Sequence, residues 1–229
     1  MKRNHIAIAL FIALFSQILY AQEKSGIKFN YGIKAGFQAV TYNHNSFCID
    51  GYNFNDNTIQ SDKIGYTVNP FMRFTWKHFY FQTEGAIGIT RHTFDFIPQE
   101  TSLLGDANPE YRLTTYCMQV PLLLGYNFID QENYGMSVFT GTRTKFIFTS
   151  RSKQEFSDFK YEGLEEELTT PVYYWEIGLG VRIYNVFFDV TYDWGFIESK
   201  NVITDKESGR EFLSKRSDNI LSFTVGFIF

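Results

Sequence analysis

The sequence predicts an all-β fold: an eight-stranded antiparallel up-and-down transmembrane β-barrel with short periplasmic turns and four long outer loops. Three observations support this prediction. Apolar and polar residues alternate with a period of two over eight segments, the connections between segments alternate between short and long, and aromatic residues make up 19% of the chain. Successive side chains of a strand point to opposite faces, so each segment has one apolar face and one polar or glycine-rich face.

Each segment is long enough to cross a bilayer as a tilted strand, which takes about 9–11 residues. The segments are residues 28–41, 64–76, 79–92, 112–128, 135–148, 172–183, 186–196 and 219–229. Short connections are expected at 77–78, 129–134 and 184–185, and long polar ones at 42–63, 95–111, 149–171 and 197–218. Short turns on one side and long loops on the other are typical of outer-membrane barrels, in which the short turns are periplasmic.

The first residues have the features of a secretory signal peptide. Lys2 and Arg3 form a basic start, Ile6 to Leu19 is an apolar stretch, and Ala21 is a small residue at the expected cleavage point. The apolar stretch is shorter than the roughly 20 residues that span a bilayer, which disfavours an uncleaved anchor. We therefore predict a signal peptide over residues 1–21 and an outer-membrane barrel domain over residues 22–229, exported through the periplasm.

The charge balance restricts the class of partner. Removal of Lys2 and Arg3 leaves 19 of the 21 Lys and Arg residues against 25 Asp and Glu, so the mature chain has a net charge of −6. A nucleic-acid partner would require a basic face, so none is expected. No later segment is apolar for long enough to form a spanning helix. The expected surroundings are outer-membrane lipid.

A soluble β-sandwich or a lipocalin-like barrel would also alternate, but with the polar face toward water. Two features argue against it. Glycines recur on the polar face, where a solvent-exposed strand has little use for them. Large aromatic residues lie near the ends of the segments on the apolar face, as in the aromatic girdles of membrane barrels: Trp76, Phe79, Tyr126, Phe128, Trp175, Tyr192 and Trp194.

Charged residues on the polar face should meet inside the barrel, because an eight-stranded barrel is just wide enough to be filled by side chains. They are Lys34, Arg73, Glu84, Arg143, Lys145, Glu176, Arg182, Asp189 and Asp193, with Lys28 near the periplasmic end. Buried charges must be paired or hydrogen-bonded, so we expect a charge network in the barrel interior.

The tight turns allow an estimate of register. If Ile183 faces Val186, then Glu176 faces Asp193, and a cation must lie between these carboxylates; Arg143 is the first choice and Lys145 the second. If Trp76 faces Phe79, then Arg73 faces Gln82 and lies diagonal to Glu84. The carboxylate pair could serve acid/base catalysis or bind a cation. A structural plug of ion pairs is the favoured interpretation, since such pairs also cluster carboxylates.

Other residues give weaker signals. Cys48 and Cys117 are expected on the same side of the membrane, in an oxidising environment. A disulfide between them and two free thiols are both left open. The histidines of the mature chain, His44, His78 and His92, form no nucleophile–base set by spacing. The segment from Asp50 to Asp62 lacks the glycine and closing glutamate of a calcium loop. We therefore expect no catalytic residue, no cofactor and no metal.

The stretch from Tyr116 to Tyr126 reads Tyr-Cys-Met-Gln-Val-Pro-Leu-Leu-Leu-Gly-Tyr. It resembles the fourth-strand motif of the PorT-like outer-membrane β-barrel family of the Bacteroidetes. Gln119 stands where that family has an acidic residue, and Gly125 where it has Lys. The strand patterns around Gly141, around Gly178 and at Tyr192-Asp193-Trp194-Gly195 are similar to the family as well. The resemblance implies a barrel strand pattern and no catalytic residue.

Some members of that family act in gliding motility or in type IX secretion. This resemblance, the expected filled lumen and the lack of a nucleophile–base set together predict a non-enzymatic barrel that acts as a membrane anchor or assembly partner of outer-membrane or periplasmic proteins. We expect the barrel to be monomeric. Two alternatives remain open at this stage. One is a narrow gated pore for small solutes. The other is a lipid-modifying outer-membrane enzyme.

Overall fold

The computed structural model describes the backbone of residues 26–49, 52–54, 59–96, 110–155, 164–167, 170–196, 199–205 and 211–229. Side chains are described for residues 26–41, 64–91, 114–149, 170–196 and 217–229. The expected signal peptide, residues 1–21, lies outside both sets. Within the described residues, no helix has the length and apolarity needed to cross a membrane.

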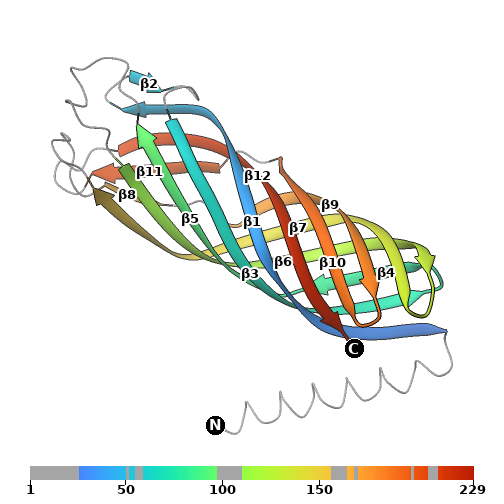
Figure 1. Cartoon of the computed structure of the whole chain (residues 1–229). Coiled ribbons are helices and arrows are strands. Elements are labelled where there is room, and N and C mark those ends of the chain that lie inside the picture. The colour runs from blue at the N-terminus through green and yellow to red at the C-terminus, as the bar shows by residue number, and fades with distance from the viewer. Residues whose placement is uncertain are drawn as a thin grey trace, which may run out of the picture.

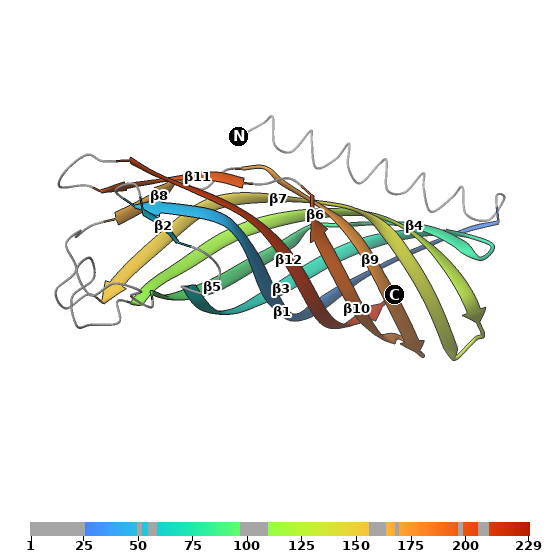
Figure 2. The same cartoon turned by 90° about the horizontal axis from the view of Figure 1, so that it is seen from above.

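The strands close into a ring that has, over the described residues, eight positions (Figures 1 and 2). In order around the ring they are β1 (Ile27–Ile49), β3 (Ile59–Trp76), β4 (Phe79–Glu84) together with β5 (Ala86–Phe96), β6 (Glu110–Asp130), β7 (Tyr134–Glu155), β9 (Val172–Ile183), β10 (Val186–Gly195) and β12 (Glu211–Ile228). All neighbours are antiparallel, and β12 pairs with β1 from Gly32 opposite Ile228 onward. The predicted fold class is confirmed.

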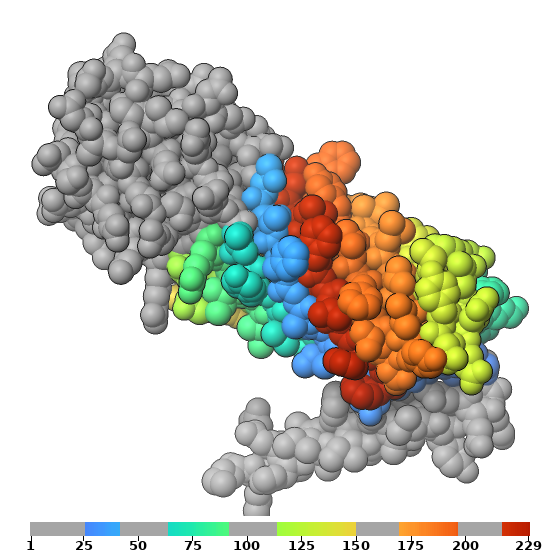
Figure 3. Space-filling view, viewed as in Figure 1, coloured from blue at the N-terminus to red at the C-terminus, as the bar shows by residue number. Residues whose placement is uncertain are grey.

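The outer wall is apolar, as the alternation predicts. Along β9, for example, the outward residues Ile177 and Leu179 are 53% and 59% exposed, whereas the inward residue Glu176 is 0% exposed. Figure 3 shows one side of this wall, formed by β1, β12, β10 and β9. Trp175 lies opposite Trp194, and Trp76 lies opposite Phe79. These pairs place exposed aromatic rings toward the outer and periplasmic ends of the wall, where membrane girdles lie.

Inward glycines make room for inward aromatic rings. Among the described side chains, five large rings point into the lumen, and each lies directly across from a glycine on the next strand. The pairs are Phe71 with Gly32, Tyr80 with Gly125, Phe139 with Gly178, Tyr174 with Gly195, and Phe187 with Gly226. A Cβ atom on Gly125 would lie 2.0 Å from Cζ of Tyr80. The glycines of the polar face therefore let a narrow barrel hold aromatic side chains.

The third predicted strand, residues 79–92, is interrupted at Gly85. Its two parts, β4 and β5, keep one register against β3, because Phe71 faces Glu84 and Val68 faces Ile87. Gly85 lies at the place that faces Pro70 and donates its N–H to the Pro70 carbonyl at 3.0 Å. Proline has no N–H to return, so the ladder loses one bond at this point.

The expected long loops are partly strands. β1, β3, β5, β6, β7 and β12 all continue outward beyond the predicted ends of their segments, and the pairing of β6 with β7 extends to Glu110 opposite Glu155. Three short strands belong to the same outer region: β2 (Tyr52–Phe54), β8 (Leu164–Glu167) and β11 (Ser199–Asp205). Figure 1 shows these elements beyond the outer end of the ring. The polar composition that predicted loops reflects a region outside lipid, where strands need no apolar face.

In this outer region the described strands of the one sheet continue as two groups of paired strands. The pairing of β1 with β3 ends at Ala39 opposite Ile64. Beyond that point β3, β5, β6 and β7 stay together, and β1 and β12 stay together with β11, β8 and β2. We call these extensions the outer strand groups.

Replacement of Gly125 by Ala tests the pairing of glycine with ring. We expect a loss of about 1–3 kcal/mol in the free energy of unfolding, because the added methyl group overlaps the Tyr80 ring. The measurement is urea unfolding in liposomes, followed by tryptophan fluorescence. Gly135→Ala is the matched control, since its Cβ would lie 3.3 Å from the flexible end of Arg182. Equal losses in the two variants would contradict the proposed packing.

Candidate functional site

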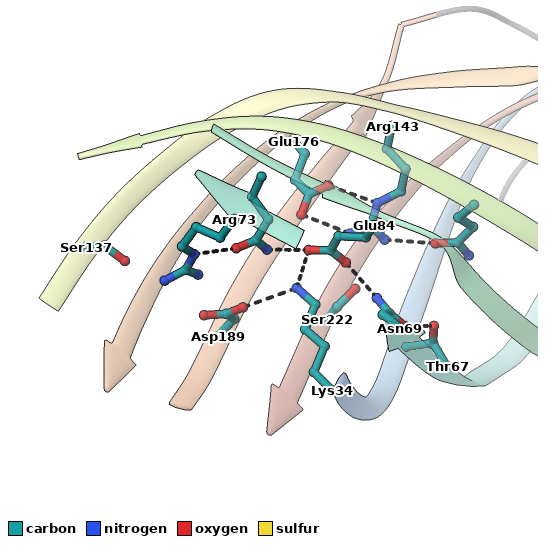
Figure 4. Close-up of polar contacts among 12 residues, drawn as sticks. Lys34, Thr67, Asn69, Arg73, Glu84, Ser137, Arg143, Glu176, Asp189 and Ser222 are labelled. Carbon is teal, nitrogen blue, oxygen red and sulfur yellow. Dashed lines mark hydrogen bonds and ion pairs between the residues drawn. The ribbon is translucent and has the colours of Figure 1, made fainter. Parts of the chain in front are cut away.

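The candidate site is a polar core at mid-height in the lumen, built from side chains that point inward from every part of the wall (Figure 4). The alternation of each strand turns these residues inward, and the ring brings opposite walls within reach of one another. The side chains of Lys34, Glu84, Arg143, Glu176 and Asp193 are all at most 3% exposed. We describe the core as two clusters.

The Lys34 cluster joins three strands across the lumen. Nζ of Lys34, from β1, lies 2.7 Å from Oε1 of Glu84 on β4 and 3.2 Å from Oδ2 of Asp189 on β10. Glu84 also accepts hydrogen bonds from Gln82 at 2.7 Å and from Asn69 at 2.9 Å. Figure 4 shows Glu84 at the centre of these contacts. Both carboxylates thus share one ammonium group, and Glu84 is held by two amides as well.

The Arg143 cluster has one guanidinium between two facing carboxylates. Asp193 on β10 lies directly opposite Glu176 on β9, as the sequence predicts. Arg143, from β7, donates from Nε to Oε2 of Glu176 at 2.9 Å. Its Nη2 lies 2.9 Å from Oε1 of Glu176, and its Nη1 lies 2.9 Å from Oδ2 of Asp193, as ion pairs without hydrogen-bond geometry. The structure thus places Arg143, the first choice of cation, between the two carboxylates.

Amide side chains extend from the Arg143 cluster across the barrel. Nη1 of Arg143 donates to Oε1 of Gln119 at 3.0 Å, and Nε2 of Gln119 donates to Oε1 of Gln38 at 3.3 Å. Gln38 in turn lies 3.4 Å from the hydroxyl of Ser222. Gln119 on β6 and Gln38 on β1 come from different parts of the ring, so this chain of contacts spans the lumen. Below it, Phe71 and Phe187 meet edge to face at 5.2 Å.

Three predicted members of the network have other surroundings. Arg73 donates from Nε to Gln82 at 2.7 Å and stacks over the Tyr80 ring, so it joins the Lys34 cluster through Gln82. Lys145 is buried but has no ion pair among the described side chains. Arg182 lies apart from the core, at the periplasmic end, where it pairs with Asp130 at 3.2 Å. Parity places Arg182 on the inner side, but its position next to the 184–185 turn sets it at the mouth.

The cysteines and histidines add no reactive group to the core. Cys117 carries a free buried thiol whose Sγ lies 3.6 Å from the Gly88 carbonyl. Of the two alternatives left open for Cys48 and Cys117, the structure has the free thiol at Cys117. The side chains of Cys48, His44 and His92 lie outside the described ones. His78 is in the turn after β3 and lies against Tyr126, with ring centroids 5.9 Å apart. Among the described residues, no three His, Cys, Asp or Glu side chains form a metal-binding group.

The geometry favours the structural interpretation of the carboxylate pair. Glu176 and Asp193 are both 0% exposed, so a substrate could reach them only if the core opened. Ions removed from water are stabilised here by close, charge-assisted contacts, and removal of one partner would leave the others uncompensated. The aromatic side chains that fill the lumen were not predicted from the sequence, apart from the inward position of Tyr80. The glycine that lies across from each of them is the sequence signal that could have identified them.

Replacement of Arg143 by Met should lower the free energy of unfolding by about 3–5 kcal/mol, because two buried carboxylates lose their only common cation. Arg182→Met is the matched control, with an expected loss of about 0–1 kcal/mol for a partly exposed pair. The measurement is again urea unfolding in liposomes. A combined Arg143→Met, Glu176→Gln, Asp193→Asn variant should recover much of the loss. If it were no more stable than Arg143→Met alone, the assigned electrostatic function would be wrong.

The comparisons with known proteins agree with this architecture. The outer membrane protein beta-barrel domain family matches residues 16–201. The outer membrane protein OprG from Pseudomonas aeruginosa is similar in structure, with a TM-score of 0.59, 12% identity, and coverage of 87% of this chain and 95% of OprG. At such low identity the similarity shows the fold alone.

Two other solved structures match with lower TM-scores. Ail, the attachment invasion locus protein of Yersinia pestis, has a TM-score of 0.38, 12% identity, and coverage of 88% and 99%. The outer membrane protease OmpT from Escherichia coli has a TM-score of 0.41, 10% identity, and coverage of 88% and 96%. No curated protein matches the sequence. The closed ring, its lipid-facing wall and the family match together show that this chain belongs to the outer membrane protein beta-barrel domain family and lies in the outer membrane.

Proposed function

We propose that this protein is a closed, non-enzymatic barrel that anchors an interaction surface in the outer membrane. The observation that supports this proposal most directly is the filled lumen. Contacts between Lys34 and Glu84 and between Gln38 and Gln119 join opposite parts of the wall at mid-height. A barrel whose interior is occupied in this way is suited to hold position in the membrane and to present its ends.

The outer strand groups supply a surface for such a function. In the described sheet β2 and β8 are the terminal strands. A terminal strand has unpaired backbone N–H and C=O groups along one side, and these can pair with a strand of another protein. Partner proteins of the outer membrane or periplasm are therefore part of the proposal.

The resemblance to the PorT-like family narrows the process. The two departures from its fourth-strand motif have a physical explanation in the fold. Gln119, at the acidic position, accepts a hydrogen bond from Arg143, as a carboxylate there could. Gly125, at the Lys position, lies across from the Tyr80 ring and leaves no room for a side chain. The proposal is a PorT-like barrel of the Bacteroidetes with a function in type IX secretion or gliding.

Planar-bilayer recording tests whether the barrel is closed. We expect no discrete openings from the purified protein, because the two clusters and the aromatic rings occupy the lumen. A variant with Lys34, Glu84 and Asp189 all replaced by Ala is the comparison, since it removes one cluster without leaving a lone charge. Openings in the variant alone would support closure by the core. Regular openings in the unchanged protein would favour a narrow gated pore. This pore is the second candidate function, and the polar side chains of the core support it.

Deletion of the gene tests the cellular process. We expect loss or reduction of type IX export and of gliding, with recovery when the unchanged gene is supplied on a plasmid. A second complementation should use the Arg182→Met variant, whose fold we expect to be intact. The measurements are secretion of a type IX cargo and spreading on agar. Normal export and normal gliding in the deletion strain would contradict this part of the proposal.

A further inference from the structure

The periplasmic end of the lumen holds a cavity of about 400 Å³, below the Lys34 cluster. Its walls come from β1, β3, β6, β7, β9, β10, the end of β12 and the turns at 129–134 and 184–185. This volume lies within the range of about 300–1,000 Å³ typical of small-molecule sites. The lining is mostly polar, with the amides of Asn30, Asn127, Gln131 and Asn185 around it. We call it the mouth cavity.

Arg73 lines the inner part of the mouth cavity and is held in a fixed orientation. Its Nε donates to Gln82 at 2.7 Å, and its Cζ lies 4.2 Å from the centroid of the Tyr80 ring. Phe71 and Phe187 lie further out at 5.8 Å and 6.0 Å from the same carbon atom. In Figure 4 the two terminal nitrogens of Arg73 lie on the side away from Glu84, above Asp189 in this view. The aromatic ring and Gln82 therefore occupy one face and one edge of the guanidinium, and its outer edge remains available.

Three carboxylates line the mouth cavity, and two of them have their own cation partner: Asp189, which also attracts Arg73 electrostatically, pairs with Lys34, and Asp130 pairs with Arg182. Among the described residues, Arg73 has no carboxylate within ion-pair distance. Lys28 lies on the same wall, nearer the opening: Asn30 faces Arg73 and Lys28 faces Thr75 in the pairing of β1 with β3. Two cations on neighbouring strands thus line one side of the cavity.

We propose that the mouth cavity binds a carboxylate group, which pairs with the terminal nitrogens of Arg73 and is attracted by Lys28 at the opening. A carboxylate matches the fork of a guanidinium with two parallel hydrogen bonds. The lining also contains Asp130, Glu132 and Asp189, which repel a multiply charged phosphate more strongly than a single carboxylate. The carboxylate can belong to a small acid or to the C-terminus of a periplasmic polypeptide. This inference does not depend on the proposed function in export.

Calorimetric titration of the full-length mature protein in zwitterionic micelles tests the site. The probes are butyrate, an N-acetylated tetra-alanine peptide with a free C-terminus, the same peptide with an amidated C-terminus, and inorganic phosphate. We expect saturable binding of the butyrate or of the free peptide, and none of the amidated peptide. Tighter binding of butyrate indicates a small acid, and tighter binding of the free peptide indicates a polypeptide terminus. No saturable binding of either, or tighter binding of phosphate, would overturn the assignment.

Variants separate this site from general attraction to a cation. Arg73→Gln should weaken binding about tenfold or more, as expected when a charge-assisted paired contact is lost. Lys28→Gln, at the exposed opening, should weaken it a few-fold without affecting the fold. Lys77→Gln is the matched control, because Lys77 is in the turn at the same end but does not line the cavity. If Arg73→Gln does not fold, the test is the carboxylate affinity of Lys28→Gln compared with that of Lys77→Gln. Equal affinities in these two variants would contradict the proposal.

Discussion

Closure of the ring by β1 and β12 is the constraint from which the other features of this structure follow. Lipid offers no hydrogen bond to a backbone N–H or C=O group, so each spanning strand must pair on both sides. The pairing of Gly32 with Ile228 through Ala39 with Leu221 removes the last free edge in the membrane. Once eight strand positions close, the interior is too narrow to hold bulk water across its width. Charges that the alternation turns inward must then find partners there.

The interior meets this requirement in two ways. One ammonium and one guanidinium group are each shared by two carboxylates, with amides to complete the contacts. Five aromatic rings of the described part of the chain fill the remaining width, because each has a glycine opposite. These solutions act together at Arg73, whose guanidinium stacks on Tyr80 while its Nε binds the Gln82 that supports Glu84.

The ends differ in a way that bears on function. On the outer side the wall divides into two groups of paired strands with terminal strands, which suits contacts with other chains. On the periplasmic side the lumen widens into a polar cavity with an available guanidinium edge. A closed middle between two differently built ends is consistent with an anchor that has partners on either side of the membrane.

The sequence by itself determined the ring and much of the core. A strict period of two fixes which side chains face lipid, and two-residue turns fix register. The facing of Glu176 and Asp193 therefore followed from spacing, with Arg143 as the first and Lys145 as the second choice of cation between them. Register counted from a turn stays accurate over one hairpin, but it carries no information about strands on the opposite wall. For this reason the contacts of Lys34 with Glu84 and Asp189 could be expected only as pairing of some kind.

Only the tertiary structure decided how far the strands extend, which charges lie at the mouth, and which rings fill the lumen. Outside the membrane a strand needs no apolar face, so the polar segments after residues 41 and 148 were predicted as loops although their backbone continues in pairs. Arg182 and Arg143 share the inner parity but lie at different heights along the barrel axis. The ion pair of Arg182 with Asp130 is therefore partly exposed, whereas that of Arg143 with Glu176 is buried. Parity is a property of the chain, whereas depth and contact across the lumen arise from the curvature of the closed sheet.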